Sequence, residues 1–379
     1  MLENINKEEI IEKIIKEIQI LKLKNEKLEE RVESLEKENN IKKQIIKKEE
    51  DLDCKEKMND FEGRIKTLEK LYFGSNLRNI KTKKVHKTQI NYITSFPFSG
   101  NIISVSNDLS INIYNKNLES IQTIKNAHSR NITFIDIKDE NNFISCSFDK
   151  TIKTWIKKEN KFQLNHTINY AHKNFIYKVI YALNNNLISC SADKTIKIWS
   201  YYNNNYQCIT ILNHLDEVKS FLLLEDKKIL ITSGWDKTIF WNINNYNILF
   251  IEENARCSSV NALKRIDNDK IIIGGESNGL IQIISIKEKE IVNKIENGFE
   301  CWGICIIKDK DVILIGGRSN IIKIYSCDNY NCIKIIKDAH GLINFHNTGF
   351  GSYIYGFLEL KDGMILSYSN ADTIKFWIF

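Results

Sequence analysis

Apolar residues between Ile11 and Lys42 recur at alternating steps of three and four, which is the heptad pattern of a coiled coil. β-Branched residues at position a with leucine at position d favour a parallel dimer. We expect Asn25 to set the register, because two asparagines can hydrogen-bond across a dimer seam. Position a holds Ile11, Ile18, Asn25, Val32 and Asn39, and position d holds Ile14, Leu21, Leu28 and Leu35.

Charged residues beside this seam are complementary between two parallel copies. Each g position faces the e position five residues later on the other helix, and all three such pairs join opposite charges. The pattern breaks near residues 49–57 and resumes as far as Phe73. The sequence therefore predicts a coiled coil over residues 1–73 that makes a homodimer. The pairs are Glu17 with Lys22, Lys24 with Glu29, and Arg31 with Glu36.

From Lys84 onward the pattern changes to short apolar alternations, each preceded by a histidine and followed by a Ser/Thr-rich strand and a polar turn. The histidines at 86, 128, 172 and 214 are separated by 42, 44 and 42 residues. A period of roughly 40 to 45 residues is typical of a repeat that folds into four strands. The second part of the chain is therefore predicted to be a repeat protein made of β-sheets.

The best-preserved copies are Ile144–Trp155 and Ile188–Trp199, which read ISCSFDKTIKTW and ISCSADKTIKIW. They resemble the WD-repeat (WD40) family. The resemblance implies an all-β, seven-bladed β-propeller whose blades are each held by a His, Ser/Thr, Asp and Trp set. The matching residues are His86, Ser104, Asp108 and Tyr114; His128, Ser145, Asp149 and Trp155; His172, Ser189, Asp193 and Trp199; and His214, Thr232, Asp236 and Trp241.

The last three copies depart from this pattern. Gly274-Gly275 and Gly316-Gly317 replace the serine-containing strand, and neither copy has the histidine. Degeneracy by drift and degeneracy by adaptation both remain open. The other departures are Asn278 and Asn320 near the aspartate position and Ala371 at that position in the copy from His340 to Trp377.

The seventh copy ends before its outermost strand, which residues 79–85 can supply. We therefore expect the propeller to span residues 79–379 and to be closed by strand 79–85 pairing with the last blade.

Composition adds little to this picture. Residues 1–75 contain 17 Lys+Arg against 19 Asp+Glu, out of 54 and 48 in the chain, so the remainder is mildly basic. Its lysines are dispersed rather than clustered, so nucleic-acid binding is not predicted. The nine cysteines have no framework spacing, which predicts a protein without disulfides. No apolar run is long enough to cross a bilayer, so we expect a protein of the cytoplasm or the nucleus.

The repeated His-Ser-Asp set indicates a structural device rather than a catalytic triad, because an active site does not recur in successive repeats. Cys301, Cys305, Cys327 and Cys332 lack the C-x2-C spacing of a zinc site. No phosphate-binding or dinucleotide-binding glycine motif occurs. We therefore expect no enzyme activity, no metal and no cofactor.

Partners of WD propellers generally bind the face that carries the histidine loops. Positions three and five residues after each histidine, and those just before the turn aspartate, are predicted to lie there. The insertion at residues 342–351 can be a functional loop or a tolerated one. The predicted partner-binding residues are Phe148, Phe175, Tyr177, Glu217, Lys219, Trp235, Tyr353 and Tyr355; the same offsets give Gln89, Asn91, Asn131 and Thr133.

These features predict a scaffold that dimerises by its coiled coil and binds proteins on the propeller face. Its domain order resembles that of the autophagy coiled-coil and WD-repeat proteins. One alternative is a G-protein β-like subunit whose helix pairs with another chain. Another is a ubiquitin-ligase substrate receptor, although none of the four repeat tryptophans is followed by the aspartate of the docking motif: Trp155, Trp199, Trp241 and Trp377.

Overall fold

The computed structural model describes residues 12, 15–26, 77–182, 185–275, 279–340, 352–370 and 372–379. The chain divides into two compact units, Met1–Glu69 and Lys70–Phe379. In the first unit residues 15–26 form an α-helix, and the rest of the predicted coiled coil lies outside the described residues. No helix in the described part is long and apolar enough to cross a membrane.

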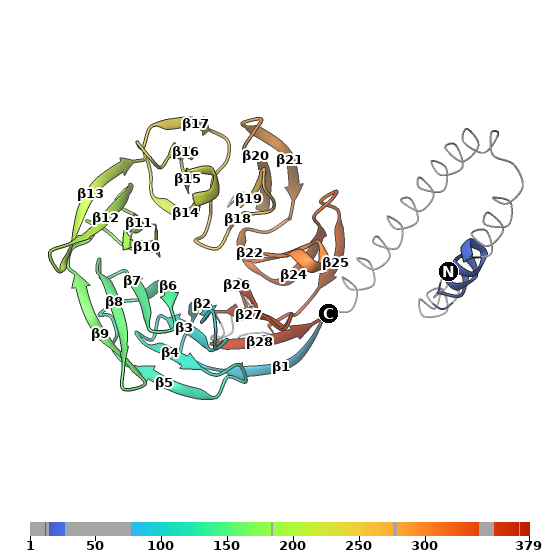
Figure 1. Ribbon diagram of the computed structural model, residues 1–379, viewed down its shortest axis with the longest axis horizontal. Coiled ribbons are helices and arrows are strands. Elements are labelled where there is room, and N and C mark those ends of the chain that lie inside the picture. The colour runs from blue at the N-terminus through green and yellow to red at the C-terminus, as the bar shows by residue number, and fades with distance from the viewer. Residues whose placement is uncertain are drawn as a thin grey trace, which may run out of the picture. The chain divides into compact units, whose positions relative to one another are not determined.

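Within the described residues, the second unit contains seven four-stranded antiparallel sheets arranged as the blades of a ring (Figure 1). The predicted seven-bladed β-propeller is thus confirmed. The first three blades are β2 (Ile90–Ser95), β3 (Ile102–Ser106), β4 (Ile111–Tyr114) and β5 (Ser120–Ile124); β6 (Ile132–Asp139), β7 (Asn142–Ser147), β8 (Ile152–Lys158) and β9 (Lys161–Ile168); and β10 (Ile176–Tyr181), β11 (Leu187–Ser191), β12 (Thr195–Tyr202) and β13 (Asn205–Asn213).

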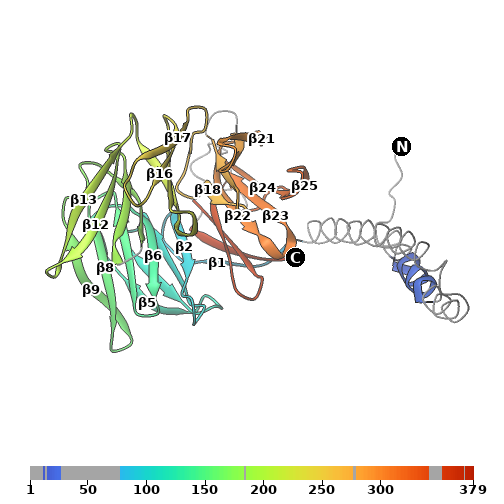
Figure 2. The ribbon, with the colours of Figure 1, turned by 45° about the horizontal axis from the view of Figure 1, so that its top comes forward.

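The remaining blades follow in chain order around the ring, and Figure 2 shows their strands running across its thickness. They are β14 (Val218–Leu224), β15 (Ile229–Gly234), β16 (Thr238–Asn242) and β17 (Ile248–Glu252); β18 (Leu263–Arg265), β19 (Lys270–Gly274), β20 (Leu280–Ser285) and β21 (Glu290–Glu296); β22 (Cys301–Ile307), β23 (Val312–Gly317), β24 (Ser319–Ser326) and β25 (Cys332–Ile336); and β26 (Ile354–Glu359), β27 (Ile365–Ser369) and β28 (Thr373–Ile378), joined by β1 (Arg78–Lys84).

Burial falls from the middle of each blade to its rim. The second strand of a blade is sandwiched between neighbouring blades, so all five residues of β3 and of β11 are buried. The outermost strand faces solvent, and β1 and β5 are mostly exposed. The apolar runs of the second strands, which lack alternation in the sequence, reflect this burial on both faces.

The ring closes between the two ends of the propeller sequence. β1 pairs antiparallel with β28, from Arg78 opposite Ile378 to Lys84 opposite Thr373. The side chains of Lys84 and Asp372 form an ion pair of 2.6 Å beside this ladder. The seventh blade therefore takes its outermost strand from the segment that precedes the first blade, which links the two ends of the ring.

Glycine allows the innermost strands of the sixth and seventh blades to approach closely. A Cβ added to Gly303 would lie 2.6 Å from the Cα of Gly356 and 2.9 Å from its nitrogen. One added to Gly356 would lie 2.7 Å from the ring carbon that bears the Tyr368 hydroxyl. β22 and β26 thus touch backbone to backbone, a packing that larger residues would prevent.

Candidate functional site

The His, Ser, Asp and Trp residues that the repeats predict in the second and third blades form a connected hydrogen-bond network. In the second blade His128 Nδ1 lies 2.9 Å from Asp149 Oδ2, and His128 Nε2 lies 2.8 Å from Ser145 Oγ. The Trp155 indole donates to the same serine oxygen over 2.9 Å. The third blade repeats this arrangement with distances of 2.9, 2.7 and 2.9 Å.

The first and fourth blades keep the network with substitutions. In the fourth, Thr232 Oγ1 replaces the serine and is 2.8 Å from both His214 Nε2 and Trp241 Nε1. In the first, Tyr114 replaces the tryptophan, and its hydroxyl donates to the Val85 carbonyl over 2.6 Å. The phenol hydroxyl therefore ties the blade to the loop before it.

The seventh blade retains three of the four residues of the set. His340 Nε2 is 2.6 Å from Ser367 Oγ, and the Trp377 indole donates to that oxygen over 2.8 Å. The aspartate position, Ala371, lies outside the described residues, as do Asn278 and the 342–351 insertion. Burial, together with the charge of Lys375, lowers the pKa of His340 to about 3.

Apolar residues replace the network in the fifth blade. Strand pairing places Ile273 opposite Gln282, as Ser189 stands opposite Lys197 in the third blade, so Ile273 occupies the serine position. Ile284 likewise takes the place of the tryptophan, and both isoleucines are fully buried. Gly274 and Gly275 follow the former serine position rather than occupying it.

Burial and hydrogen bonding set the charge state of these networks. Burial lowers the pKa of His128 and of His172, although their aspartates oppose the effect. A neutral imidazole can donate from Nδ1 to the aspartate and accept at Nε2 from the serine, which satisfies both ring nitrogens. The histidine side chains have no exposed surface, so they are closed to a substrate.

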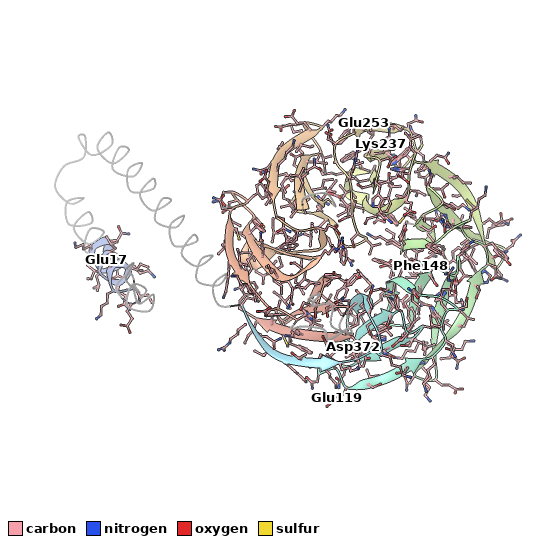
Figure 3. All side chains as sticks on the ribbon, turned by 180° about the vertical axis from the view of Figure 1, so that it is seen from behind. Glu17, Glu119, Phe148, Lys237, Glu253 and Asp372 are labelled. Atoms are coloured by element: carbon pink, nitrogen blue, oxygen red, sulfur yellow. The ribbon has the colours of Figure 1, made fainter. Side chains whose placement is uncertain are left out.

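The predicted aromatic residues of the second and third blades lie together. The rings of Phe148 and Phe175 stack with centroids 4.3 Å apart, and Tyr177 approaches Phe148 edge-on at 6.1 Å. The guanidinium of Arg130 lies 5.1 Å from the centre of the Phe175 ring. Phe148 lies nearer the centre of the ring than Glu119 or Glu253 on the rim (Figure 3).

An ion pair joins this cluster to the fourth blade. Lys219 Nζ donates to Glu217 Oε2 over 2.6 Å and to the Tyr177 hydroxyl over 2.8 Å. The same ammonium group lies 4.2 Å from the centre of the Trp235 ring, and Trp235 is 39% exposed. We call Phe148, Phe175, Tyr177, Glu217, Lys219 and Trp235 the aromatic face.

Burial raises the pKa of Tyr177, and the Glu217 carboxylate adds to this effect. The phenol therefore stays protonated and serves as a donor to Glu217.

One residue given by the same offsets has a different role. Thr133 is buried, and its hydroxyl donates between blades to the Ile176 carbonyl, so it is not part of the binding face.

Tyr353 and Tyr355 lie apart from the aromatic face, and both contact Trp302, at ring distances of 5.4 and 5.1 Å. The sequence analysis missed Trp302 because its offsets were counted from histidines, and the sixth blade has none. Strand pairing shows that Trp302 corresponds to Lys219, since each lies at the register shift of the first strand of its blade.

The fourth and sixth blades share a further pattern at this face. Glu217 corresponds to Glu300, and Trp235, beside Gly234, corresponds to Arg318, beside Gly317. Arg318 Nη1 donates to Glu300 Oε1 over 3.1 Å. Both blades therefore present a glutamate, a cation and a tryptophan, with the last two exchanged.

A recess of about 360 Å³ lies at the side of Trp235, toward the fifth blade. Its lining includes Arg256, Gln282 and Gly275. Among the described residues no cluster of His, Cys, Asp and Glu side chains could hold a metal ion. The aromatic face thus presents stacked aromatic rings and a hydrogen-bonded ion pair.

The comparisons with known proteins agree with this architecture. The sequence model of the family described as WD domain, G-beta repeat, matches residues 118–155 and 162–200, which contain the complete sets of the second and third blades. Residues 118–200 therefore contain two WD40 repeats, and the second unit folds as a seven-bladed β-propeller. WD40 propellers generally bind other proteins and act as scaffolds.

One solved structure, described as the WD40 beta propeller domain of Doa1, superposes on 79% of this chain and 96% of its own with a TM-score of 0.63. The two sequences are 15% identical, so this likeness concerns the fold alone. No curated protein matches the sequence.

Proposed function

We propose that this protein is a non-enzymatic adaptor of the cytoplasm that dimerises through residues 1–73 and binds protein partners on its propeller face. The observation that carries the binding role is the aromatic face, where rings from three blades are joined by stacking and by the Glu217–Lys219 pair. Aromatic side chains held in place lose little entropy on binding, and they dominate the energy of many interfaces.

The structural role of the buried sets supports a function without catalysis. Histidine, serine and aspartate meet in several blades, and each imidazole is sealed from solvent. WD40 propellers are typically non-catalytic scaffolds.

The binding role is tested by quantitative affinity purification of the full chain carrying Phe175→Ala or Trp235→Ala. We expect each change to reduce recovery of the same partners by at least about tenfold, since hot-spot rings contribute about 2 kcal/mol or more. Phe98→Ala is the matched control, because Phe98 is 82% exposed in the β2–β3 turn at the opposite end of the strands. Unchanged recovery with both face variants would reject this role.

The described part of the N-terminal helix supports dimerisation by exposing apolar side chains. Ile15 and Leu21 are 48% and 50% exposed, while Ile18 and Asn25, both at predicted a positions, are partly buried. Two coupled propellers would bind a multivalent partner more tightly than one.

Light scattering on the full chain tests this second element. A dimer that becomes a mixture of larger species in Asn25→Ile supports the predicted register, because isoleucine at position a no longer selects the dimer. A monomeric wild-type chain contradicts homodimerisation and favours a helix that pairs with a different protein, as in a G-protein β-like subunit.

A further inference from the structure

The aromatic face is a continuous strip across three blades. Its contacts run from ring to ring, with Phe175 and Phe148 4.3 Å apart and Phe148 and Tyr177 6.1 Å apart. The Lys219 ammonium group then bridges Tyr177 and Trp235, since it lies 4.1 and 4.2 Å from the centres of their rings. A partner segment laid along this strip would therefore contact rings of the second, third and fourth blades in turn.

An exposed arginine lies at each end of this strip. At one end the Arg130 guanidinium lies 5.1 Å from the centre of the Phe175 ring, and the exposed Lys173 in the same loop as Phe175 adds positive charge. At the other end Arg256 lines the recess that also includes Trp235. Among the described residues neither guanidinium donates a hydrogen bond or belongs to an ion pair. Each therefore keeps its donors available for a carboxylate.

The glutamates along the strip are already engaged within the protein. The Glu217 carboxylate accepts hydrogen bonds from the Tyr177 hydroxyl and from Lys219, each over 2.6 Å. Beside the recess, Glu253 pairs with Lys237 over 3.2 Å. Neither glutamate forms an ion pair with the arginines at the ends of the strip.

The aspartates of these loops are shielded as well. The turn aspartates of the second, third and fourth blades each bond to a histidine, and their side chains are 6%, 6% and 10% exposed. Asp216 is partly buried, and its carboxylate accepts from the Glu217 amide over 2.8 Å. The strip therefore presents two available guanidinium groups to a partner, while its carboxylates are bound within the protein.

We propose that the aromatic face binds an extended segment of another protein in which two acidic residues flank apolar or aromatic ones. One carboxylate binds Arg130, and the other enters the recess and binds Arg256. A planar guanidinium group can hold a carboxylate by two parallel hydrogen bonds, and the rings between the arginines pack against the apolar side chains. This inference rests on the proposed binding role and gives the chemistry of the partner.

Single-stranded nucleic acid also binds rings and cations, but it matches this strip less well. Its phosphates repeat at every nucleotide, and its affinity depends on many contacts with cations. Here the available guanidinium groups lie at the two ends, and the Glu217 carboxylate lies between them. A protein segment can place its negative charges at two positions only, which fits this distribution.

Selection of random linear peptides, displayed on phage, against the full chain tests this chemistry. We expect the selected peptides to be enriched in Asp or Glu at two positions separated by apolar residues. Peptides selected on Arg256→Glu should have Lys or Arg at one of these positions, and those selected on Arg130→Glu at the other, because the complementary charge is inverted. Lys161→Glu is the matched control, since it makes the same change of charge at an exposed position at the opposite end of the strands. It should leave both acidic positions unchanged.

A binding titration with one selected peptide separates a direct contact from damage to the face. Arg256→Glu should weaken binding of the parent peptide at least about tenfold, and replacing the matching acid of the peptide by lysine should recover most of that loss. The same exchange at the other acid should rescue Arg130→Glu. Failure of every exchanged peptide to recover binding would overturn the proposal.

The outcomes distinguish this inference from the adaptor role. Selected peptides without acidic enrichment that no longer bind Phe175→Ala would reject the acidic partner and keep the binding role. Peptides that bind Phe175→Ala and Trp235→Ala as tightly as the wild type would count against both. A library that yields no specific peptide would reject a linear segment as the occupant. Binding of a single-stranded oligonucleotide that Phe175→Ala abolishes would assign the face to nucleic acid instead.

Discussion

The Tyr325 hydroxyl donates a hydrogen bond of 3.1 Å to the side-chain oxygen of Asn297 in the interior of the sixth blade. Tyr325 stands where the second and third blades have tryptophan, and Asn297 precedes the blade as the histidines do. The asparagine is fully buried and the tyrosine is 3% exposed. One direct bond thus joins the loop and the third strand, which the second, third and seventh blades join through a serine.

Removing one partner of this bond should destabilise the protein. Asn297→Ala leaves the buried phenol without its acceptor, which we expect to lower the free energy of unfolding by about 1 to 3 kcal/mol. Adding Tyr325→Phe to that variant should recover part of the loss. Tyr330→Phe is the control: within the described structure the Tyr330 hydroxyl is buried without a hydrogen-bond partner, so its removal should not destabilise. Additive losses in the double variant would contradict a direct bond.

Ser145→Ala should be more damaging than an ordinary serine substitution. Ser145 Oγ is shared by His128 Nε2 and Trp155 Nε1, so its loss leaves two buried polar groups unsatisfied. We expect a loss of about 2 to 4 kcal/mol in chemical denaturation. Ser120→Ala, at an exposed position of the outer strand β5, should change stability by less than about 0.5 kcal/mol. Equal effects would mean that the network does not stabilise the blade.

His340 should make the protein sensitive to mild acid. Burial lowers its folded-state pKa to about 3, whereas an unfolded histidine titrates near 6.5. Below about pH 6.5 the unfolded chain therefore binds a proton at His340 that the folded chain does not bind. Protonation of the unfolded chain lowers the free energy of unfolding by about 1.4 kcal/mol for each pH unit below this value, and it has no effect above it.

The test compares the wild type with His340→Asn at pH 7 and pH 5 by chemical denaturation. Whatever its absolute stability, the variant should lose about 2 kcal/mol less than the wild type over this interval, since a single titrating group has been removed. The same loss in both proteins would show that His340 is accessible to protons in the folded state.

Gly303→Ala should strain the junction between the sixth and seventh blades. Its new methyl group would lie 2.6 Å from the Cα of Gly356. The contacted atoms belong to the backbone of Tyr355 and Gly356, which cannot move aside as a flexible side chain can. We expect a loss of about 1 to 3 kcal/mol, measured as a lower melting temperature. An unchanged melting temperature would show that β22 and β26 can separate without cost.

The sequence predicted the first four blades well because their network needs particular residue types at fixed offsets. His128 and Asp149, for example, are recognisable without any structure. In the fifth blade the buried residue Ile273 replaces the serine. Isoleucine occurs in every kind of propeller strand, so it does not identify the serine position, and only the repeat period predicted this blade. Trp302 was missed for the related reason that the histidine from which its position would be counted is absent.

Closure of the ring by β1 has a consequence during protein synthesis. β1 is made first, but Thr373, the residue that pairs with Lys84, emerges 289 residues later. At ordinary translation rates this delay is about 15 to 60 s. For that time β1 is an unpaired strand, and its Arg78, Lys81, Lys83 and Lys84 give it a strong positive charge that discourages pairing with other nascent chains.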